Sequence, residues 1–206
     1  MFKSKTGATL RVAASAASLC AVFASSSVLA EGGYFGIGST YTRMEDAGTT
    51  LIGTVFDDHD AGVKIFAGYQ FNPNVAFEVG YTDFGKFSAS GAVSVPPFGT
   101  VDGDRWEATG VSVSALLGGP ISPRFSIFAR AGLIGWNVDD TFVLNGSPVS
   151  ASASGTSLDV GVGAQYRFGR LITGRLEWEQ IPKVGDTDTT GRSDLAVVSA
   201  NLLFRF

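Results

Sequence analysis

The chain has 206 residues, of which 45% are hydrophobic and 17% charged, and 15 basic residues against 19 acidic ones give a net charge of −4. An acidic chain without a basic stretch argues against a nucleic-acid-binding protein, because such proteins neutralise phosphates with clustered lysine and arginine. The single cysteine, Cys20, excludes a framework of intramolecular disulfides.

The first 30 residues have the organisation of a secretory signal peptide. Three basic residues lie in the first eleven positions, an apolar run follows over 12–23, and Val28 and Ala30 precede a predicted cleavage site before Glu31. A retained membrane helix is the alternative, but it needs about 20 predominantly apolar residues. Five serines interrupt this segment after residue 12, so we predict a cleaved leader.

Removing the leader makes the chain more acidic. Residues 31–206 retain 12 basic and all 19 acidic residues, a net charge of −7, and no cysteine. Their length suits one domain, and no later segment is apolar enough for a membrane helix. We therefore predict a signal peptide over 1–30 and a single mature domain over 31–206.

Strands are predicted along the mature sequence, because apolar residues alternate with small or polar ones in eight segments. The first covers 33–42 and places Phe35, Ile37 and Tyr41 on one face. The others cover residues 61–71, 75–82, 105–117, 125–133, 158–168, 172–179 and 195–206. Their lengths suit the roughly 9 to 11 residues that a tilted membrane strand needs.

The predicted connections alternate in length. Short ones lie at 72–74, 118–124 and 169–170, whereas long polar loops are predicted at 43–60, 86–103, 137–157 and 182–193. Short turns at one rim and long loops at the other are the layout of an outer-membrane barrel.

The alternation also fits a soluble lipocalin-like barrel, whose interior is apolar and whose outside is charged. One face of the predicted strands carries Lys64, Glu78, Arg130, Arg175 and Glu177, and the other face is nearly uncharged. A water-facing exterior needs many more charges than these, so the scarcity of charge favours a lipid-facing exterior.

Aromatic residues gather toward the strand ends on the apolar face. Near the short turns lie Tyr69, Phe71, Tyr166, Phe168, Phe204 and Phe206, and toward the long loops lie Tyr41, Tyr81 and Trp178. Two such bands match the girdles at the two membrane interfaces. The sequence therefore predicts an all-β fold, an eight-stranded antiparallel up-and-down transmembrane β-barrel.

At "GYQFNPNVAFEVGYTDFGK", residues 68–86, the sequence resembles the transmembrane domain of the outer-membrane protein A (OmpA) family. The likeness continues through "ATGVSVSALLGGPIS", "RAGLIGW", "TGRLEWEQIPKVGD" and "VSANLLFRF". It implies a monomeric barrel in the bacterial outer membrane with its short turns in the periplasm. Larger members also carry a peptidoglycan-binding domain, which is not expected here because the sequence ends at Phe206.

The resemblance also implies a charged lumen. The family has a lumenal carboxylate and arginine that pair, and they match Glu78 and Arg175, whereas the alternative lysine and glutamate partners match Leu116 and Gln165. Lys64, Arg130 and Glu177 lie on the same face of their predicted strands as Glu78 and Arg175. We therefore expect these five residues to form a mixed-sign network in the bore.

The last strand resembles the signal that the outer-membrane assembly machinery reads in such barrels. It ends in Phe206, with Phe204 and Leu202 at alternate positions before it. Simple packing of an end aromatic is the alternative. The assembly machinery is thus an expected partner, together with the lipid bilayer.

Catalysis is not expected. Hydrolytic or acyl-transfer work needs a serine close to a histidine that a carboxylate orients. The one histidine, His59, lies in "FDDHDA", where Asp57, Asp58 and Asp60 offer hard metal ligands. This cluster is interpreted as a solvated acidic loop, so no enzyme activity, cofactor or metal is predicted.

Two functions remain open. In the first, the barrel is a structural and surface-interaction module, adhesin-like, whose long loops meet an extracellular or host ligand. In the second, it is a small pore of low conductance. Eight strands leave an interior just wide enough for side chains, and Phe66, Phe128, Trp106, Leu116 and Leu203 are predicted to fill it. We therefore favour the first function.

Overall fold

The computed structural model describes residues 32–45, 51–57, 59–93, 99–144, 147–186 and 191–206, so the predicted leader lies outside the described residues. In this part of the chain nine strands form: β1 (Gly33–Glu45), β2 (Leu51–Asp57), β3 (His59–Asn72), β4 (Val75–Val93), β5 (Gly99–Pro120), β6 (Phe125–Leu144), β7 (Ser147–Arg167), β8 (Ile172–Asp186) and β9 (Gly191–Arg205). No helix within the described ranges is long and apolar enough to cross a membrane.

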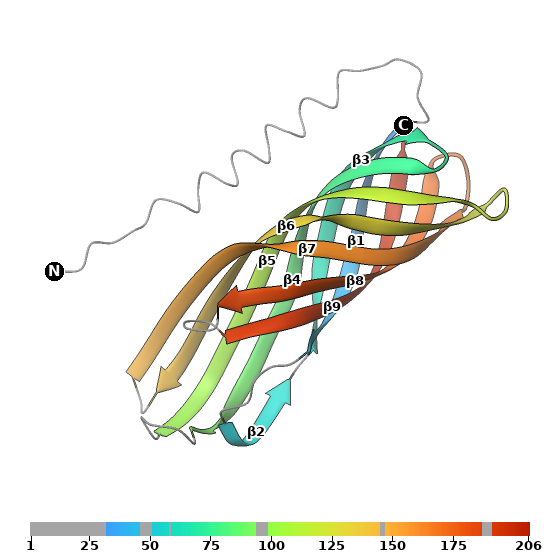
Figure 1. Ribbon diagram of the computed structural model, residues 1–206. Coiled ribbons are helices and arrows are strands. Elements are labelled where there is room, and N and C mark those ends of the chain that lie inside the picture. Colours follow the sequence, from blue (N-terminus) through green and yellow to red (C-terminus); the bar gives the residue numbers. More distant parts are fainter. Residues whose placement is uncertain (1–31, 46–50, 58, 94–98, 145–146, 187–190) are drawn as a thin grey trace.

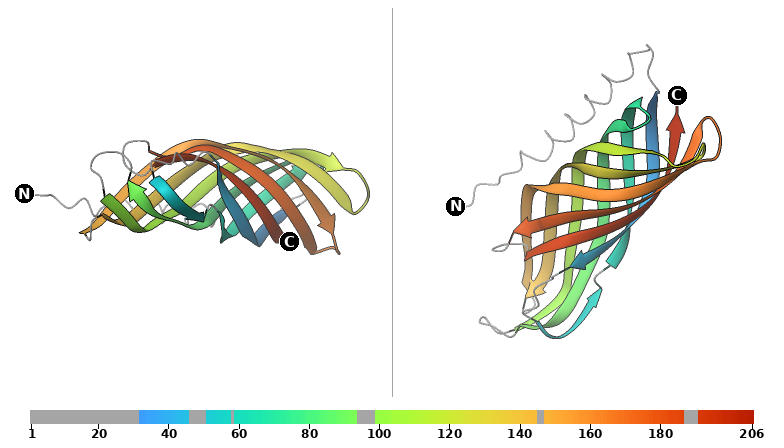
Figure 2. Two further views of the ribbon diagram at one scale, coloured as in Figure 1. Left: turned by 90° about the horizontal axis from the view of Figure 1, so that it is seen from below. Right: turned by 45° about the vertical axis from the view of Figure 1, so that its right-hand side comes forward.

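Eight of these strands close into a barrel. Neighbours pair antiparallel in the order β1, β3, β4, β5, β6, β7, β8 and β9, and β9 pairs with β1 to complete the ring. β2 lies in the connection from β1 to β3 and pairs with the far end of β4. Figures 1 and 2 show β2 at the end of the barrel opposite the C-terminus. The predicted eight-stranded antiparallel barrel is confirmed, with β2 as an addition.

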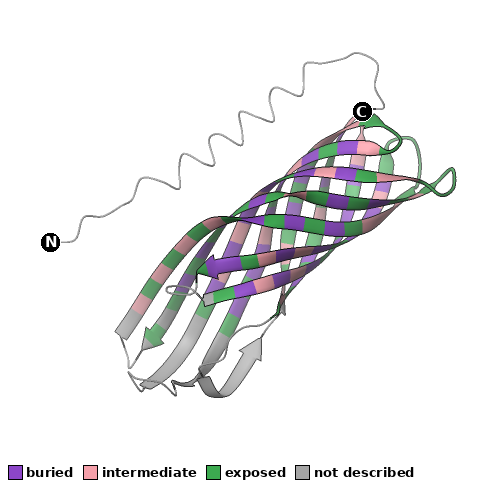
Figure 3. Ribbon diagram, in the orientation of Figure 1, coloured by how far each residue is buried: buried purple, intermediate pink, exposed green. Residues whose placement is uncertain are grey.

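Burial alternates from residue to residue along the strands, as Figure 3 shows. On β3 the side chains of Val63 and Ile65 are about half exposed, whereas Lys64 between them is buried. On β1, Phe35 is half exposed and Thr40 is buried. Apolar side chains therefore cover the outside of the barrel, and its polar and charged side chains lie inside together with some buried apolar ones, which agrees with the facing rule of a membrane barrel.

Glycines make room for aromatic rings inside this narrow barrel. A Cβ atom on Gly36 would collide with the ring of Phe66, and one on Gly163 would collide with the ring of Phe128. The glycines of these inner positions thus allow large rings to lie inside the narrow bore of an eight-stranded barrel.

The segments predicted as long loops are largely strand, which corrects that prediction. Within 137–157, β6 and β7 stay paired from Asn137 opposite Ser154 to Leu144 opposite Ser147. The β4 and β5 ladder likewise runs to Val93 opposite Gly99. In Figure 1 the far ends of β4 to β7 reach beyond the β8–β9 hairpin on one side of the barrel. We call this extension, residues 86–93, 99–108, 134–144 and 147–156, the distal sheet.

A β-bulge on β4 explains why the strand pattern was lost after residue 83. On β4 the register shifts between Asp83 and Lys86, where Gly85 has a φ of 91° that a residue without Cβ adopts readily. Thr82 before the shift and Phe87 after it are both buried, although they lie five residues apart. The lumen-facing residues therefore change from even to odd numbers at the bulge. A constant period of two assigns the residues beyond the bulge to the wrong face.

The distal sheet follows the opposite facing rule. Its buried inner side chains form one apolar cluster that includes Phe87, Trp106, Ile134, Trp136 and Val138. Its exposed outer positions include Lys86, Arg105, Asn137, Asp139, Ser152 and Ser154. An apolar inside and a polar outside are typical of a sheet that faces water. The same strands therefore have a lipid-facing surface near the short turns and a water-facing one in the distal sheet.

Candidate functional site

The structure brings the five predicted lumen residues together at one level of the bore. Lys64 lies on β3, Glu78 on β4, Arg130 on β6, and Arg175 and Glu177 on β8, all buried. Strand register sets the level, because Arg130 pairs with Gly161 of β7, which in turn pairs with Glu179 of β8. Four strands thus deliver three cations and two carboxylates to the same place.

Glu78 is bound from three directions. Its Oε1 accepts from Arg175 Nη1 and from Tyr34 Oη, each at 2.6 Å, and its Oε2 accepts from Arg130 Nη2 at 3.0 Å. In the ring of eight strands, β4 and β8 are separated by three strands on either side. The Glu78–Arg175 pair therefore spans the full width of the bore.

Lys64 and Arg130 share the carboxylates of β8. Lys64 Nζ lies 3.2 Å from Glu177 Oε2 and also pairs with Glu179. Arg130 Nη1 lies 3.3 Å from Glu177 Oε1 and 3.5 Å from Glu179 Oε2. Glu177 also accepts from the amide of Asn201, at 3.3 Å. These bonds connect the Glu78–Arg175 pair to one continuous network.

Three members of this network were not among the five predicted residues. Glu179 binds both Lys64 and Arg130, and Asp159 Oδ2 lies 3.2 Å from Arg130 Nε. Tyr34 is the third, through its bond to Glu78. In their predicted strands, Glu179 and Asp159 occupy positions that face the lumen. The alternation of side chains alone was therefore enough to indicate them.

Burial makes the pairing of these charges obligatory. The side chains of the ion pairs from Lys64, Glu78, Arg130, Asp159, Arg175, Glu177 and Glu179 are between 0% and 7% exposed. Moving an ion out of water costs several kcal/mol, which only close partners and further hydrogen bonds repay. We call these seven residues, with Tyr34, the lumen network.

Apolar clusters lie on both sides of the lumen network, but a cavity lined by Tyr34, Gln165 and Arg175 passes the clusters on the short-turn side. Toward the short turns lie two buried clusters, one of Tyr34, Phe66 and Leu203 and one of Ala76, Leu116 and Phe128. Toward the distal sheet lies the larger cluster of Phe84, Phe87, Trp106, Ala108, Ile134, Trp136, Val138, Ile181, Val184, Leu195 and Val197. The residues predicted to fill the bore are therefore all buried, and the large cluster lies between the lumen network and the distal end of the barrel.

The positions that match the family's alternative partners have other contacts here. Leu116 packs against Ala76 and Phe128. The amide oxygen of Gln165 either accepts from Arg205 Nη2 at 3.5 Å or, with the amide turned over, from Arg175 Nε at 3.2 Å and Nη2 at 3.0 Å. Neither residue is charged, so neither can replace Glu78 or Arg175 as the partner in this ion pair.

The predicted assembly residues lie at the end of β9. Leu202 and Phe206 are exposed on the outer face, and the Phe204 ring stacks on Phe35 with centroids 5.0 Å apart. The Phe206 amide donates to the Gly33 carbonyl at 3.1 Å, which fastens the chain end to β1. This end lies at the outer surface, where other molecules reach it.

The acidic cluster around His59 contributes to a bulge. Asp60 Oδ1 accepts from the Ala61 amide and Oδ2 from the Lys86 amide, each at 2.7 Å. Asp58 lies outside the described residues, and the side chains of Asp57 and His59 are not described. Among the described residues no three His, Cys, Asp or Glu side chains are grouped to hold a metal ion.

Comparison with known proteins agrees with this fold. The family model of the OmpA-like transmembrane domain matches residues 30–206. Outer membrane protein A of Klebsiella pneumoniae is 32% identical over 152 residues, 70% of this chain and 41% of that protein. Outer membrane protein A of Escherichia coli O157:H7 is 29% identical over 180 residues, 84% and 47% of the two chains. The chain thus spans about half the length of the curated relatives it matches.

Solved structures of small outer-membrane barrels share the fold. Neisserial surface protein A has a TM-score of 0.57 at 16% identity, over 87% of this chain and 100% of that one. Ail, the attachment invasion locus protein of Yersinia pestis, has a TM-score of 0.55 at 18% identity, over 85% and 99%. The predicted resemblance and the outer-membrane location are confirmed. The chain belongs to the family of OmpA-like transmembrane domains, the β-barrels of the bacterial outer membrane.

Proposed function

We propose that this chain is a closed, monomeric barrel that acts as a structural and surface-interaction module of the outer membrane. The observation that most supports this proposal is the filling of the bore, where a large buried apolar cluster follows the lumen network toward the distal sheet. A pore for steady ion flow needs a continuous polar path, and this buried apolar cluster interrupts such a path. We propose neither a steady pore nor a catalytic activity.

The distal sheet supports a role at the cell surface. Since short turns of outer-membrane barrels face the periplasm, the opposite end projects outward from the cell. There the polar exterior of β4 to β7 extends beyond the β8–β9 hairpin (Figure 1). A folded sheet with a packed inner cluster presents a defined surface, and ordering it for a partner costs little further entropy.

Charge restricts the partner. Residues 43–60, 86–107, 137–157 and 182–194 together hold 13 acidic and 5 basic residues. One solved structure with this fold is Ail of Yersinia pestis in complex with a heparin analogue, sucrose octasulfate. An acidic outer end repels such a polyanion, so we propose a neutral or cationic partner for this chain.

The test removes the end of the distal sheet without touching the barrel. Asp139 and Ser152 face each other in the β6–β7 ladder, so replacing residues 140–151 by Asn-Gly closes a two-residue hairpin. The parent and this variant are expressed in a bacterium without its own barrel of this family, and attachment to cultured epithelial cells and to heparin-coated wells is counted. The control replaces Ser122 by Asn and Pro123 by Gly in a short turn.

The shortened variant should fold, which a gel-mobility difference between unheated and boiled samples checks, and should attach to cells less than the parent. The short-turn control should attach like the parent, and no strain should gain binding to heparin. Equal attachment of parent, shortened variant and empty-vector cells would overturn the surface role. Binding of the parent to heparin would overturn the proposed partner class.

A further inference from the structure

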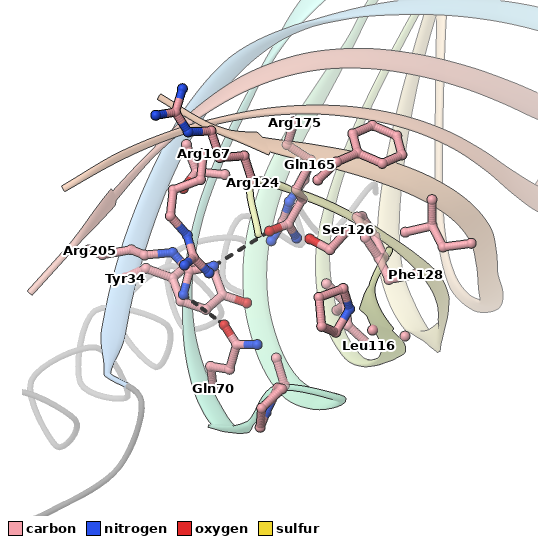
Figure 4. Close-up of a pocket in the computed structure, with 18 of the residues that line it drawn as sticks. Tyr34, Gln70, Leu116, Arg124, Ser126, Phe128, Gln165, Arg167, Arg175 and Arg205 are labelled. Carbon is pink, nitrogen blue, oxygen red and sulfur yellow. Dashed lines mark hydrogen bonds between the residues drawn. The ribbon is translucent and has the colours of Figure 1, made fainter. Parts of the chain in front are cut away.

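The short-turn end of the barrel opens into a cavity of about 930 Å³. Leu116 and Phe128 line one side, and Gln70, Tyr34 and Arg205 lie on the opposite side (Figure 4). Its size falls within the range of about 300 to 1,000 Å³ that is typical of sites for small molecules. The lumen network closes its inner end, where Arg175 lines it.

The charge of this cavity is opposite to that of the whole chain. Its described lining contains five arginines, Arg124, Arg167, Arg170, Arg175 and Arg205, and no Asp or Glu side chain. Residues 68–76, 116–128, 163–174 and 203–206 hold no acidic residue at all. Since residues 31–206 carry a net charge of −7, this separation makes the short-turn mouth an electropositive pocket.

One of the five, Arg175, is paired with Glu78 of the lumen network, whereas Arg124, Arg167 and Arg170 lie at the rim. Arg205 Nη1 donates to Gln70 Oε1 at 2.7 Å, and its guanidinium lies 5.6 Å from the centroid of the Tyr34 ring. Arg124 and Arg167 are joined through their backbones, at 2.8 Å from Arg167 N to Arg124 O. Within the described residues, Arg124, Arg167 and Arg170 form no ion pair and have exposed side chains. Their donors are therefore available to an incoming anion.

We propose that this cavity binds a phosphate-class oxyanion. Guanidinium groups match phosphate oxygens with two parallel hydrogen bonds, and several of them around one cavity favour a multiply charged group. Gln70, Gln165 and Ser126 add neutral polar groups, while Leu116 and Phe128 offer an apolar wall for the rest of the ligand. The same chemistry is present in a free phosphorylated solute of the periplasm and in the headgroup of a phospholipid.

The experiment uses the folded protein in dodecyl maltoside micelles, which contain no phosphate. In the first arm, pyrophosphate is titrated calorimetrically at low salt. In the second arm, native mass spectrometry counts bound phosphatidylglycerol against diacylglycerol, which has the same chains without phosphate. Both arms compare the parent with the rim variant, in which Arg124, Arg167 and Arg170 are each replaced by Gln.

A matched variant replaces Lys86, Arg105 and Arg192 by Gln, which removes the same charge from the opposite end of the barrel. We expect the rim variant to lose affinity by about tenfold or more, given the strength of charge-assisted hydrogen bonds, and the matched variant to bind like the parent. Binding of pyrophosphate alone identifies a free anion as the source, and selective binding of phosphatidylglycerol identifies the headgroup.

Three results would overturn the site. The first is a parent that binds neither probe. The second is a rim variant that binds as tightly as the parent, and the third is a matched variant that loses as much affinity as the rim variant. The last result would show a response to net charge without a local site. Gel mobility before and after boiling verifies that every variant is folded, and none of the altered residues belongs to the lumen network.

Discussion

Arg175 Nη1 and Glu78 Oε1 lie 2.6 Å apart, joining two strands on opposite sides of the barrel. This pair is held on each side by further charge, because Arg130 binds Glu78 at 3.0 Å and Glu177 lies 3.6 Å from Arg175. A connection across the bore links strands that no backbone ladder joins. We propose that it contributes both to stability and to closure of the lumen.

We predict that Glu78→Ala and Arg175→Ala each destabilise the folded barrel by roughly 3 to 5 kcal/mol, because each leaves a buried charge without its partner. The double variant should lose less than the sum of the two, since residues in contact are coupled. Urea unfolding in lipid vesicles measures the free energy of unfolding of the parent, the two single variants and the double variant. Additive losses would show that the pair is not coupled.

The inverted facing of the distal sheet gives a second prediction. Val138 is fully buried in the apolar cluster, and its neighbour Asp139 is exposed on the outer face. Val138→Asp should destabilise the barrel by about 3 kcal/mol or more, because it buries an unpaired charge, whereas Asp139→Val should change stability by less than about 0.5 kcal/mol. Similar effects of the two changes would refute the inverted facing.

The point along β7 at which the lipid-facing surface of the barrel ends can be measured. Val162 and Ser152 both lie on the outer face of β7, ten residues apart, and both are exposed. Val162→Lys should cost about 2 to 4 kcal/mol, as a charge at the bilayer midplane does, and Ser152→Lys about 0 to 1 kcal/mol. Unfolding in vesicles checks both. An equally large loss for Ser152→Lys would place the distal sheet inside the bilayer.

The proposed assembly signal can be separated from the aromatic girdle. Phe206 and Phe168 are 77% and 63% exposed at the short-turn end, so both serve equally well as girdle residues. Phe206→Asp should reduce the amount of folded protein in the outer membrane far more than Phe168→Asp. The measurement is the folded fraction in membrane extracts. Equal yields would leave Phe206 as a girdle residue alone.

The sequence predicted the barrel well where one rule holds along a strand. From Phe35 to Ile37, and around Lys64, alternate side chains face lipid and lumen without interruption, so a period of two identifies the strand and both of its faces. Beyond Gly85 a bulge changes the inner parity, and the outer surface becomes polar. In such a segment the lumen-facing residues do not keep a constant period of two, and the outer residues are not apolar. For these two reasons it was interpreted as a loop.

The lumen network was predicted in part for a similar reason. Inner parity selects candidates such as Lys64 and Arg130, but it does not say which charges meet across the bore. That choice depends on strand register and on side-chain length, which place Glu179 between Lys64 and Arg130. Register is a property of paired strands, so one strand's sequence alone does not contain it.

The most direct test of the closed lumen is the steady conductance of single purified barrels in planar bilayers, recorded for the parent, Glu78→Ala and the matched variant Asp139→Ala on the outer face. The filled bore predicts little steady conductance for the parent and for Asp139→Ala, and increased ion leakage for Glu78→Ala. Steady porin-like currents through the parent, or a Glu78→Ala barrel as silent as the parent, would contradict closure of the bore by the lumen network.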